Sequence, residues 1–136
     1  MDMEIVTQFS VFIPQKAGAL SKFIKILMNN DINVIGIASD VGHDLGVVRI
    51  AVEHRPKISH ILTKQGFTSV EMPMLSIVLP DKKGQLHRLT SYLAKNKVNI
   101  KTVYGTAFGG YQSRLLFTVD NMDKAKKLLK KYNGVK

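Results

Sequence analysis

The sequence predicts an α+β protein made of two copies of one small module, at residues 1–72 and 73–136. The first indication is an internal repeat, because two long segments align without a gap at an offset of 66 residues. The second is a turn with proline and glycine at matching offsets, which joins a β-rich run to a helical pattern in both copies. The third is the repeated order of strand, helix, strand, strand and helix, which the spacing of apolar residues indicates.

The aligned segments read "SVFIPQKAGALSKFIKILMNNDINVIG" and "SIVLPDKKGQLHRLTSYLAKNKVNIKT". Their matched positions include Pro14 with Pro80, Gly18 with Gly84, Leu20 with Leu86, and Asn33 with Asn99. One inserted residue near the later glycines shifts the offset to 67, at which "RIAVEH" matches "LFTVDN". A repeat of this length indicates one module used twice.

Each copy opens with a strand, at 5–13 and 74–79, that ends at a proline because proline cannot extend a central strand. A helix follows, since leucines and other apolar residues recur at helical spacing from Leu20 and from Leu86. Polar turns end both helices.

Two further strands follow in each copy, at 33–39 and 47–53 and at 99–107 and 113–119, joined by glycine-bearing hairpins. A second helix closes each copy, opened by Pro56 in one and capped by Asn121 in the other.

A last strand at 67–72 completes the first copy and gives the split β-α-β plan of ferredoxin-like folds. The second copy ends at "NGVK", so its last strand is short or missing and another segment is expected to cover that sheet edge.

The composition is that of a globular protein, with 136 residues, 45% hydrophobic content and a mean hydropathy of +0.01. No apolar run approaches the roughly 20 residues that span a bilayer, and the N-terminus lacks the pattern of a secretion signal. The absence of cysteine excludes disulfides, thiolate metal ligands and a cysteine nucleophile. We expect a cytoplasmic protein.

The net charge of +10 belongs to one half of the chain. Residues 1–71 hold seven Lys/Arg and seven Asp/Glu, whereas residues 72–136 hold thirteen and three. Much of the excess lies in "DKAKKLLKK", which reads as a helix with a lysine-rich solvated face. Only four of the twenty cations are arginine, the residue best suited to bases and phosphates, so charge gives weak support to nucleic-acid binding.

The repeated glycine turn can hold an anion. Glycine at a strand-to-helix turn adopts backbone angles that side chains disfavour. The first N–H groups of the helix have no intrahelical partner and carry partial positive charge, which suits a carboxylate or a phosphate. The alternative is that Gly18 and Gly84 serve only the turn.

The repeated asparagine, Asn33 or Asn99, follows the same helix. Its simplest role is a turn residue that satisfies local backbone groups. A helix of about ten residues, about 15 Å long, separates it from the glycine turn, so the two cannot share a small ligand within one module. If the copies pack side by side about a pseudo-two-fold axis, the Gly18 turn meets Asn99 and the Gly84 turn meets Asn33.

These residues resemble the ACT domain, a β-α-β-β-α-β module that binds amino acids and regulates amino-acid metabolism. The resemblance rests on the repeated proline-x-x-x-glycine-x-leucine turn and the later asparagine, and covers nearly the whole chain as a tandem pair. It implies an amino acid held between modules by backbone N–H groups of one turn and the asparagine of the other module. One site would use Gln15, Ala17, Gly18, Ala19 and Leu20 with Asn99, and the other Asp81, Lys83, Gly84, Gln85 and Leu86 with Asn33.

A zwitterion suits the second turn better than a phosphate does. Lys83 can hold a carboxylate, while Asp81 and the oxygen of Asn33 can accept hydrogen bonds from an ammonium group. The first turn has the uncharged Gln15 instead, so we expect the Gly84 site to bind more tightly.

Enzyme function finds little support. The four histidines share no metal-ligand spacing, and no nucleotide-binding or serine-nucleophile motif occurs. We therefore predict a non-enzymatic amino-acid sensor without a cofactor, forming a homo-oligomer such as a dimer.

Two alternatives stay open. One is a regulatory subunit of a separate metabolic enzyme. The other is an RNA-binding protein, because RNA-recognition modules share the fold plan and stack bases on aromatic residues of the third strand, where this sequence offers only Phe117. RNA binding would weaken steeply with salt, whereas binding of a pocketed amino acid would respond weakly.

Overall fold

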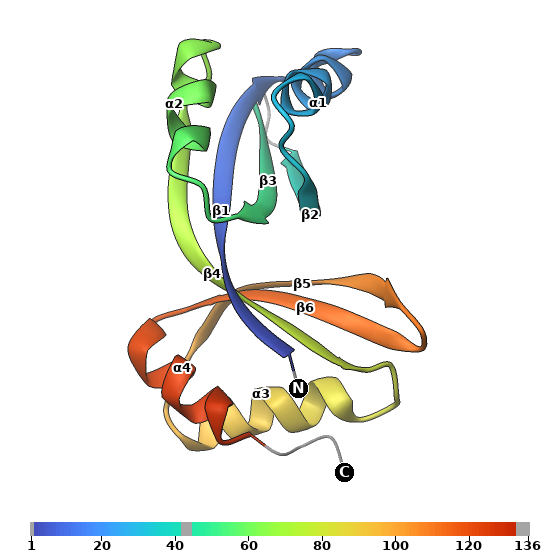
Figure 1. Ribbon diagram of the computed structural model, residues 1–136, viewed down its shortest axis with the longest axis vertical. Helices are drawn as coiled ribbons and strands as arrows, with labels where there is room; N and C mark the ends of the chain where they lie inside the picture. The colour runs from blue at the N-terminus through green and yellow to red at the C-terminus, as the bar shows by residue number, and fades with distance from the viewer. Residues whose placement is uncertain (1, 42–44, 133–136) are drawn as a thin grey trace. The chain divides into compact units, whose positions relative to one another are not determined.

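The computed structural model describes residues 2–41 and 45–132. Contacts divide them into two compact units (Figure 1). The first unit is Val6–Met72, and the second combines the residues up to Ile5 with those from Pro73 onward.

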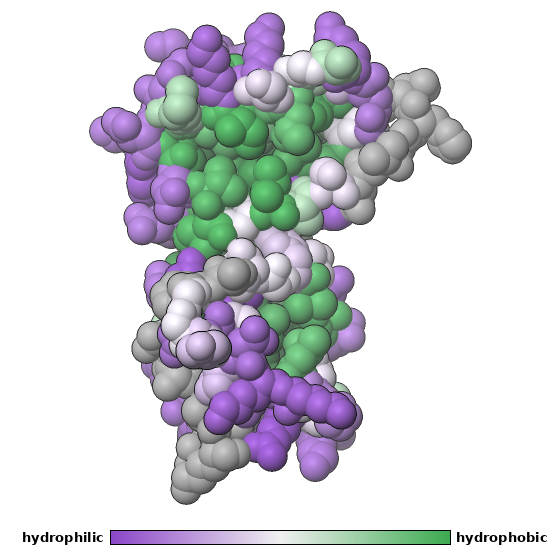
Figure 2. All heavy atoms as spheres, turned by 90° about the vertical axis from the view of Figure 1, so that its right-hand side faces the viewer, coloured by the Kyte–Doolittle hydropathy of each residue, from purple (hydrophilic) through white to green (hydrophobic). Residues whose placement is uncertain are grey.

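The first unit is a four-stranded antiparallel sheet covered by two helices. Its strands run in the order β2-β3-β1-β4, and the Phe12 N–H donates to the Thr68 carbonyl at 3.1 Å beside the start of β4. On the side seen in Figure 2, hydrophobic residues gather over the middle of this unit and hydrophilic ones surround them. Its elements are α1 (Ala19–Asn29), β2 (Val34–Val41), β3 (Leu45–Glu53) and α2 (Lys57–Lys64), with the later part of β1 (Asp2–Pro14) and the first part of β4 (Ser69–Pro80).

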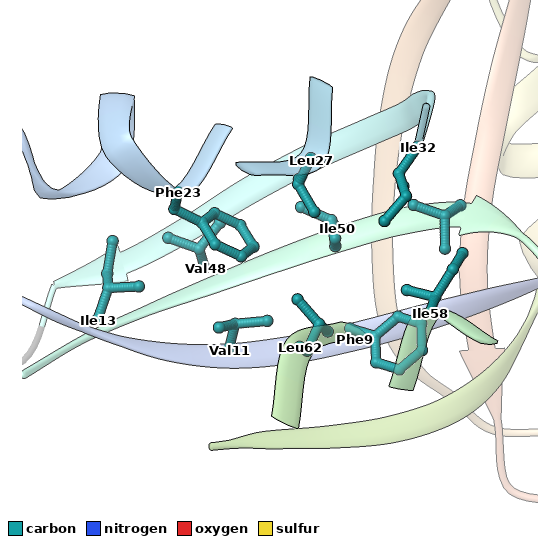
Figure 3. Packing of buried hydrophobic residues seen from close by; sticks show 11 residues of the cluster. Phe9, Val11, Ile13, Phe23, Leu27, Ile32, Val48, Ile50, Ile58 and Leu62 are labelled. Atoms are coloured by element: carbon teal, nitrogen blue, oxygen red, sulfur yellow. The ribbon is translucent and has the colours of Figure 1, made fainter. Parts of the chain in front are cut away.

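Alternating strand residues and one stripe of each helix form the core of the first unit. Phe9, Val11 and Ile13 point from β1 to the helices because successive strand residues face opposite sides. Figure 3 shows Ile13 at one end of this core and Ile32 at the other. The buried members also include Phe23, Leu27, Val48, Ile50, Val52, Ile58 and Leu62.

The second unit repeats the plan with α3 (Gln85–Lys95), β5 (Ile100–Gly109), β6 (Gln112–Val119) and α4 (Met122–Lys130). Its sheet order is β1-β4-β6-β5. The Asn121 side chain accepts a hydrogen bond from the Lys124 N–H at 3.1 Å, which confirms the predicted helix cap. Its core gathers Leu75, Ile77, Leu79, Leu89, Leu93, Val98, Phe117 and Leu129.

The start of β1 lies beside β4 in the second unit, at the sheet edge that was predicted to need a cover. No strand follows α4 among the residues described up to Tyr132. Instead the residues of β1 up to Ile5 belong to this unit, beside β4, and Met3 packs against its core. The segment that covers this sheet edge is therefore the first part of β1, up to Ile5.

The predicted α+β fold of two ferredoxin-like modules is confirmed. One difference is that the predicted strands 67–72 and 74–79 are a single strand, β4, which continues from one unit into the other as β1 does (Figure 1). The module boundaries 1–72 and 73–136 stay a prediction. Part of the expected hairpin at 40–46 lies outside the described residues.

Replacing Met3 by aspartate tests the role of the N-terminal segment. The change Met3→Asp places a charge against the second core, so we expect the free energy of unfolding to fall by about 2 kcal/mol. Urea denaturation measures this, and hydrogen exchange should lose protection in β4 and α3 first. The control Glu4→Gln changes an exposed neighbour and should leave stability within about 0.5 kcal/mol. Equal stability of Met3→Asp and the parent chain would contradict this packing role.

Candidate functional site

The two glycine turns have the same backbone geometry. Gly18 precedes α1 with φ 88° and ψ −15°, and Gly84 precedes α3 with φ 93° and ψ −13°. Both lie in the left-handed region, where a residue with a Cβ is strained. A Cβ built on either glycine would meet nothing within 4 Å, so this backbone conformation, rather than lack of space, accounts for the glycine.

Both turns present free backbone donors. The first helical N–H, of Ala19 or Gln85, donates to a lysine carbonyl three residues back at 3.2 Å. No side chain caps either helix. The next two N–H groups of each helix find no acceptor among the described residues. They belong to Leu20 and Ser21 in α1 and to Leu86 and His87 in α3. Each turn thus supplies two N–H donors at the positive end of a helix dipole, an arrangement suited to a carboxylate.

The side chains around the turns differ between the units. At the first turn, Gln15, Ala17 and the 44% exposed Leu20 face solvent, and Ala19 is half-buried.

At the second turn, Asp81, Lys83 and Leu86 are exposed. Gln85 is buried, at 8% exposure, and its Oε1 finds no hydrogen-bond partner among the described residues. The N–H of Asp81 donates to the Tyr111 carbonyl at 2.8 Å, which ties the turn to the tip of the β5–β6 hairpin.

The two asparagines predicted to bind ligand are not needed by their turns. Other residues close those turns: the side chains of Asn30 and Asn96 each donate to a helix carbonyl at 2.8 Å. Asp31 and Lys97 adopt the positive φ angles that reverse the chain. Within the described part of the chain, the exposed side chains of Asn33 and Asn99 make no hydrogen bond. The simpler role, a turn residue, is therefore unsupported.

Within the first unit the glycine turn and the asparagine lie apart, as expected. Asn33 lines surface cavities with Asp31 and Ile32, whereas Gln15 and Leu20 line a separate cavity. Figure 3 shows the same separation, since Ile13 just before the first turn and Ile32 just before Asn33 stand at opposite ends of the core. The predicted combinations of Gly18 with Asn99 and of Gly84 with Asn33 join residues of different units and stay predictions.

Other candidate chemistry is sparse. The described residues include no group of three or more side chains able to hold a metal, and none of their helices has the length and apolarity to cross a membrane. Burial raises the pKa of Tyr132, against a lowering by Arg88; this ring packs on Tyr92 in the second core, at 4.9 Å between centroids.

The ring of Tyr111, at the turn between β5 and β6, is 94% exposed, because Gly110 and Tyr111 both take positive φ in the turn and direct the side chain to solvent. Sequence reasoning missed the role of Gly46. A Cβ there would lie 2.8 Å from Nε2 of Gln15, so this strand glycine makes room for the glutamine amide. An isolated glycine in a strand pattern is the signal that could have revealed it.

Two ferredoxin-like units, each with a left-handed glycine before its first helix, define a tandem pair of one fold module. Residues 3–134 match the family model of the ACT domain pair, and the chain belongs to this family.

Solved structures share the fold. Protein BT0572 from Bacteroides thetaiotaomicron is 24% identical with a TM-score of 0.85, over 95% of this chain and 89% of that one. The ligand-free regulatory subunit of aspartate kinase from Thermus thermophilus is 15% identical with a TM-score of 0.68, over 96% and 94%. Aspartate kinase from Clostridium acetobutylicum is 18% identical with a TM-score of 0.65, over 98% of this chain and 34% of that one. No curated protein sequence matches the chain.

Alanine at the turn glycines should destabilise the fold through the backbone alone. We expect Gly18→Ala and Gly84→Ala each to lower the free energy of unfolding by about 1–2 kcal/mol, because alanine is strained at these φ angles. The matched control is Gly105→Ala, a strand glycine whose Cβ would meet Leu115 at an ordinary 3.5 Å. Chemical denaturation measures all three, and an equal loss in the control would refute the backbone explanation.

Proposed function

We propose that this chain is a non-catalytic sensor that binds an amino acid at its glycine turns. The observation that carries the proposal is the repeated turn: a left-handed glycine, followed by two helix N–H groups without an acceptor among the described residues. These donors match the α-carboxylate of an amino acid, and helix polarity favours its negative charge. Membership of the ACT domain pair family supports this assignment.

The proposed sites follow the predicted pairs. The first turn, from Gln15 to Leu20, would act with Asn99, and the second turn, from Asp81 to Leu86, with Asn33. In both asparagines the amide is unengaged among the described residues, so it can accept a hydrogen bond from the ligand ammonium group. The charged pair Asp81 and Lys83 supports tighter binding at the second turn.

A separate metabolic enzyme is the proposed partner. One similar structure is named as the regulatory subunit of aspartate kinase, and another belongs to an aspartate kinase described as an allosteric enzyme. By analogy, ligand binding here would change the affinity for an enzyme, with a coupling of about 1–3 kcal/mol. We keep the expectation of a cytoplasmic location with this proposal, which cell fractionation can test.

RNA binding is not favoured. Phe117, the aromatic residue of the third strand of the second unit, is 1% exposed and belongs to the core. It therefore offers no platform for a base.

We also propose self-association through the sheet edges. β2 and β5 each end the strand order of their own unit. At matched positions they carry Ile37 and Val103, which are 48% and 49% exposed. In the strand register Ile37 pairs with the inward-facing Ile50, and Val103 pairs with the inward-facing Phe117. An apolar side chain beside an open edge invites another strand.

Charging this edge should dissociate the oligomer. We expect Ile37→Asp to weaken self-association by at least tenfold, because the aspartate would have to be buried unpaired. Sedimentation velocity measures it, with Val70→Asp as a control of similar exposure on β4. Dissociation by the control alone would place the interface elsewhere, and a monomeric parent chain would refute self-association.

Removing the asparagine amides should weaken ligand binding without unfolding the chain. We expect Asn33→Ala and Asn99→Ala each to raise the Kd of a bound amino acid about tenfold, since one hydrogen bond to a charged group contributes roughly 1.5 kcal/mol. Their melting temperatures without ligand should stay close to that of the parent, because neither side chain bonds to the described residues. Calorimetry with the amino acid that most raises the melting temperature provides the measurement.

Asn30→Ala is the matched control, because it removes a turn amide and should lower stability rather than affinity. A flat thermal-shift screen of the standard amino acids at millimolar concentration would contradict the sensor proposal.

A further inference from the structure

The first unit holds a cavity of about 130 Å³ beside its glycine turn. Lys16 and Leu20, which flank the turn, line it together with Gln15 and with residues of β2 and β3. For scale, a cavity of roughly 150 Å³ lined by apolar side chains accepts one benzene ring. The cavity therefore has room for an apolar group of about four to six carbons.

The floor of this cavity is the end of the hydrophobic core. Ile13 and Val48 line it, and both are members of the buried cluster. Figure 3 shows them together near Phe23, where α1 begins. Leu20 adds an apolar side chain that is half exposed without a ligand. A group that entered here would cover apolar surface that otherwise faces water.

The polar residues that line the cavity are neutral except at Lys16. Gln15 and Ser39 contribute an amide and a hydroxyl, and none of the described lining residues is acidic. A lysine or arginine side chain would therefore lose its hydration without gaining a counter-charge. Lys16 is exposed on the turn itself, where it can meet the ligand carboxylate.

Gly46 sets the width of the cavity. Because it has no Cβ, the amide of Gln15 can lie over the strand backbone, with Nε2 2.8 Å from where a Cβ would stand. Gly46 is not among the described glycines with positive φ, so its backbone tolerates a side chain. Any side chain at this position would displace the glutamine amide and narrow the cavity.

We infer that this cavity receives the side chain of a neutral aliphatic amino acid of about the size of leucine, isoleucine, valine or methionine. The inference rests on the proposed function, in which the adjacent turn holds the carboxylate, and it adds the class of ligand. Each buried methylene strengthens binding roughly fourfold, so leucine, with three more carbons, should bind about 60-fold more tightly than alanine.

The test is calorimetric titration of the full chain with alanine, leucine, methionine, threonine, lysine and aspartate. It is repeated on Gly46→Val, which narrows the cavity, and on Gly105→Val, a strand glycine of the second unit where a Cβ meets ordinary contacts. At the first-turn site we expect leucine or methionine to bind most tightly, Gly46→Val to weaken binding at that site at least tenfold, and Gly105→Val to change it less than twofold. If Gly46→Val fails to fold, Ser39→Phe fills the cavity from an exposed position on β2.

The outcomes separate this inference from the proposed function. Binding of lysine, aspartate or threonine in preference to leucine and methionine would overturn the inference and leave the sensor function standing. Leucine binding that neither Gly46→Val nor Ser39→Phe weakens, in folded variants, would also overturn it. Absence of binding by every amino acid would refute the sensor function itself.

Discussion

The backbone conformation of Gly18 and Gly84 is the constraint on which each unit depends. At both positions the chain leaves a strand and enters a helix through the left-handed region, and the second and third helical N–H groups find no acceptor among the described residues. The same angles set where each helix begins on its sheet, and hence which stripe it buries: Phe23 and Leu27 in α1, and Leu89 and Leu93 in α3. The fold and the proposed ligand site thus share one conformational requirement.

The two turns share their backbone but differ in their surroundings. In the first unit, Gly46 and the neutral amide of Gln15 leave room for a cavity that ends at the hydrophobic core. In the second, the N–H of Asp81 is hydrogen-bonded to the hairpin tip, and the oxygen of the buried Gln85 side chain finds no partner in the described part of the chain. An unsatisfied buried amide costs about 1–3 kcal/mol. The two copies therefore share the turn geometry, which backbone atoms provide, while the side chains around the turns differ.

Much of this fold could be predicted from the sequence, because a repeat doubles every weak signal. Proline, glycine and leucine at matching offsets located both turns, and Asn121 was recognised as a cap from its position alone. The contribution of the first residues of β1 to the second unit could not be predicted. Nothing in the local sequence around Met3 indicates that it packs against a core formed by residues after 73. The cavity could not be predicted either, because it depends on a contact between Gly46 and Gln15, which lie 31 positions apart in the sequence.

The division of β1 between the two units affects how the chain folds during its synthesis. The first residues of β1 leave the ribosome long before β4, β6 and α3 exist, so the second unit cannot close until α4 has been synthesised. The contacts of Met3 with this unit are among the most distant in sequence, and such contacts slow folding because a long loop must close first. The second unit could not be excised as a contiguous gene fragment and keep a complete sheet, because its segment of β1 lies before the whole first unit in the sequence. Any shuffling of the second module into other proteins would have to carry the first residues of β1 with it.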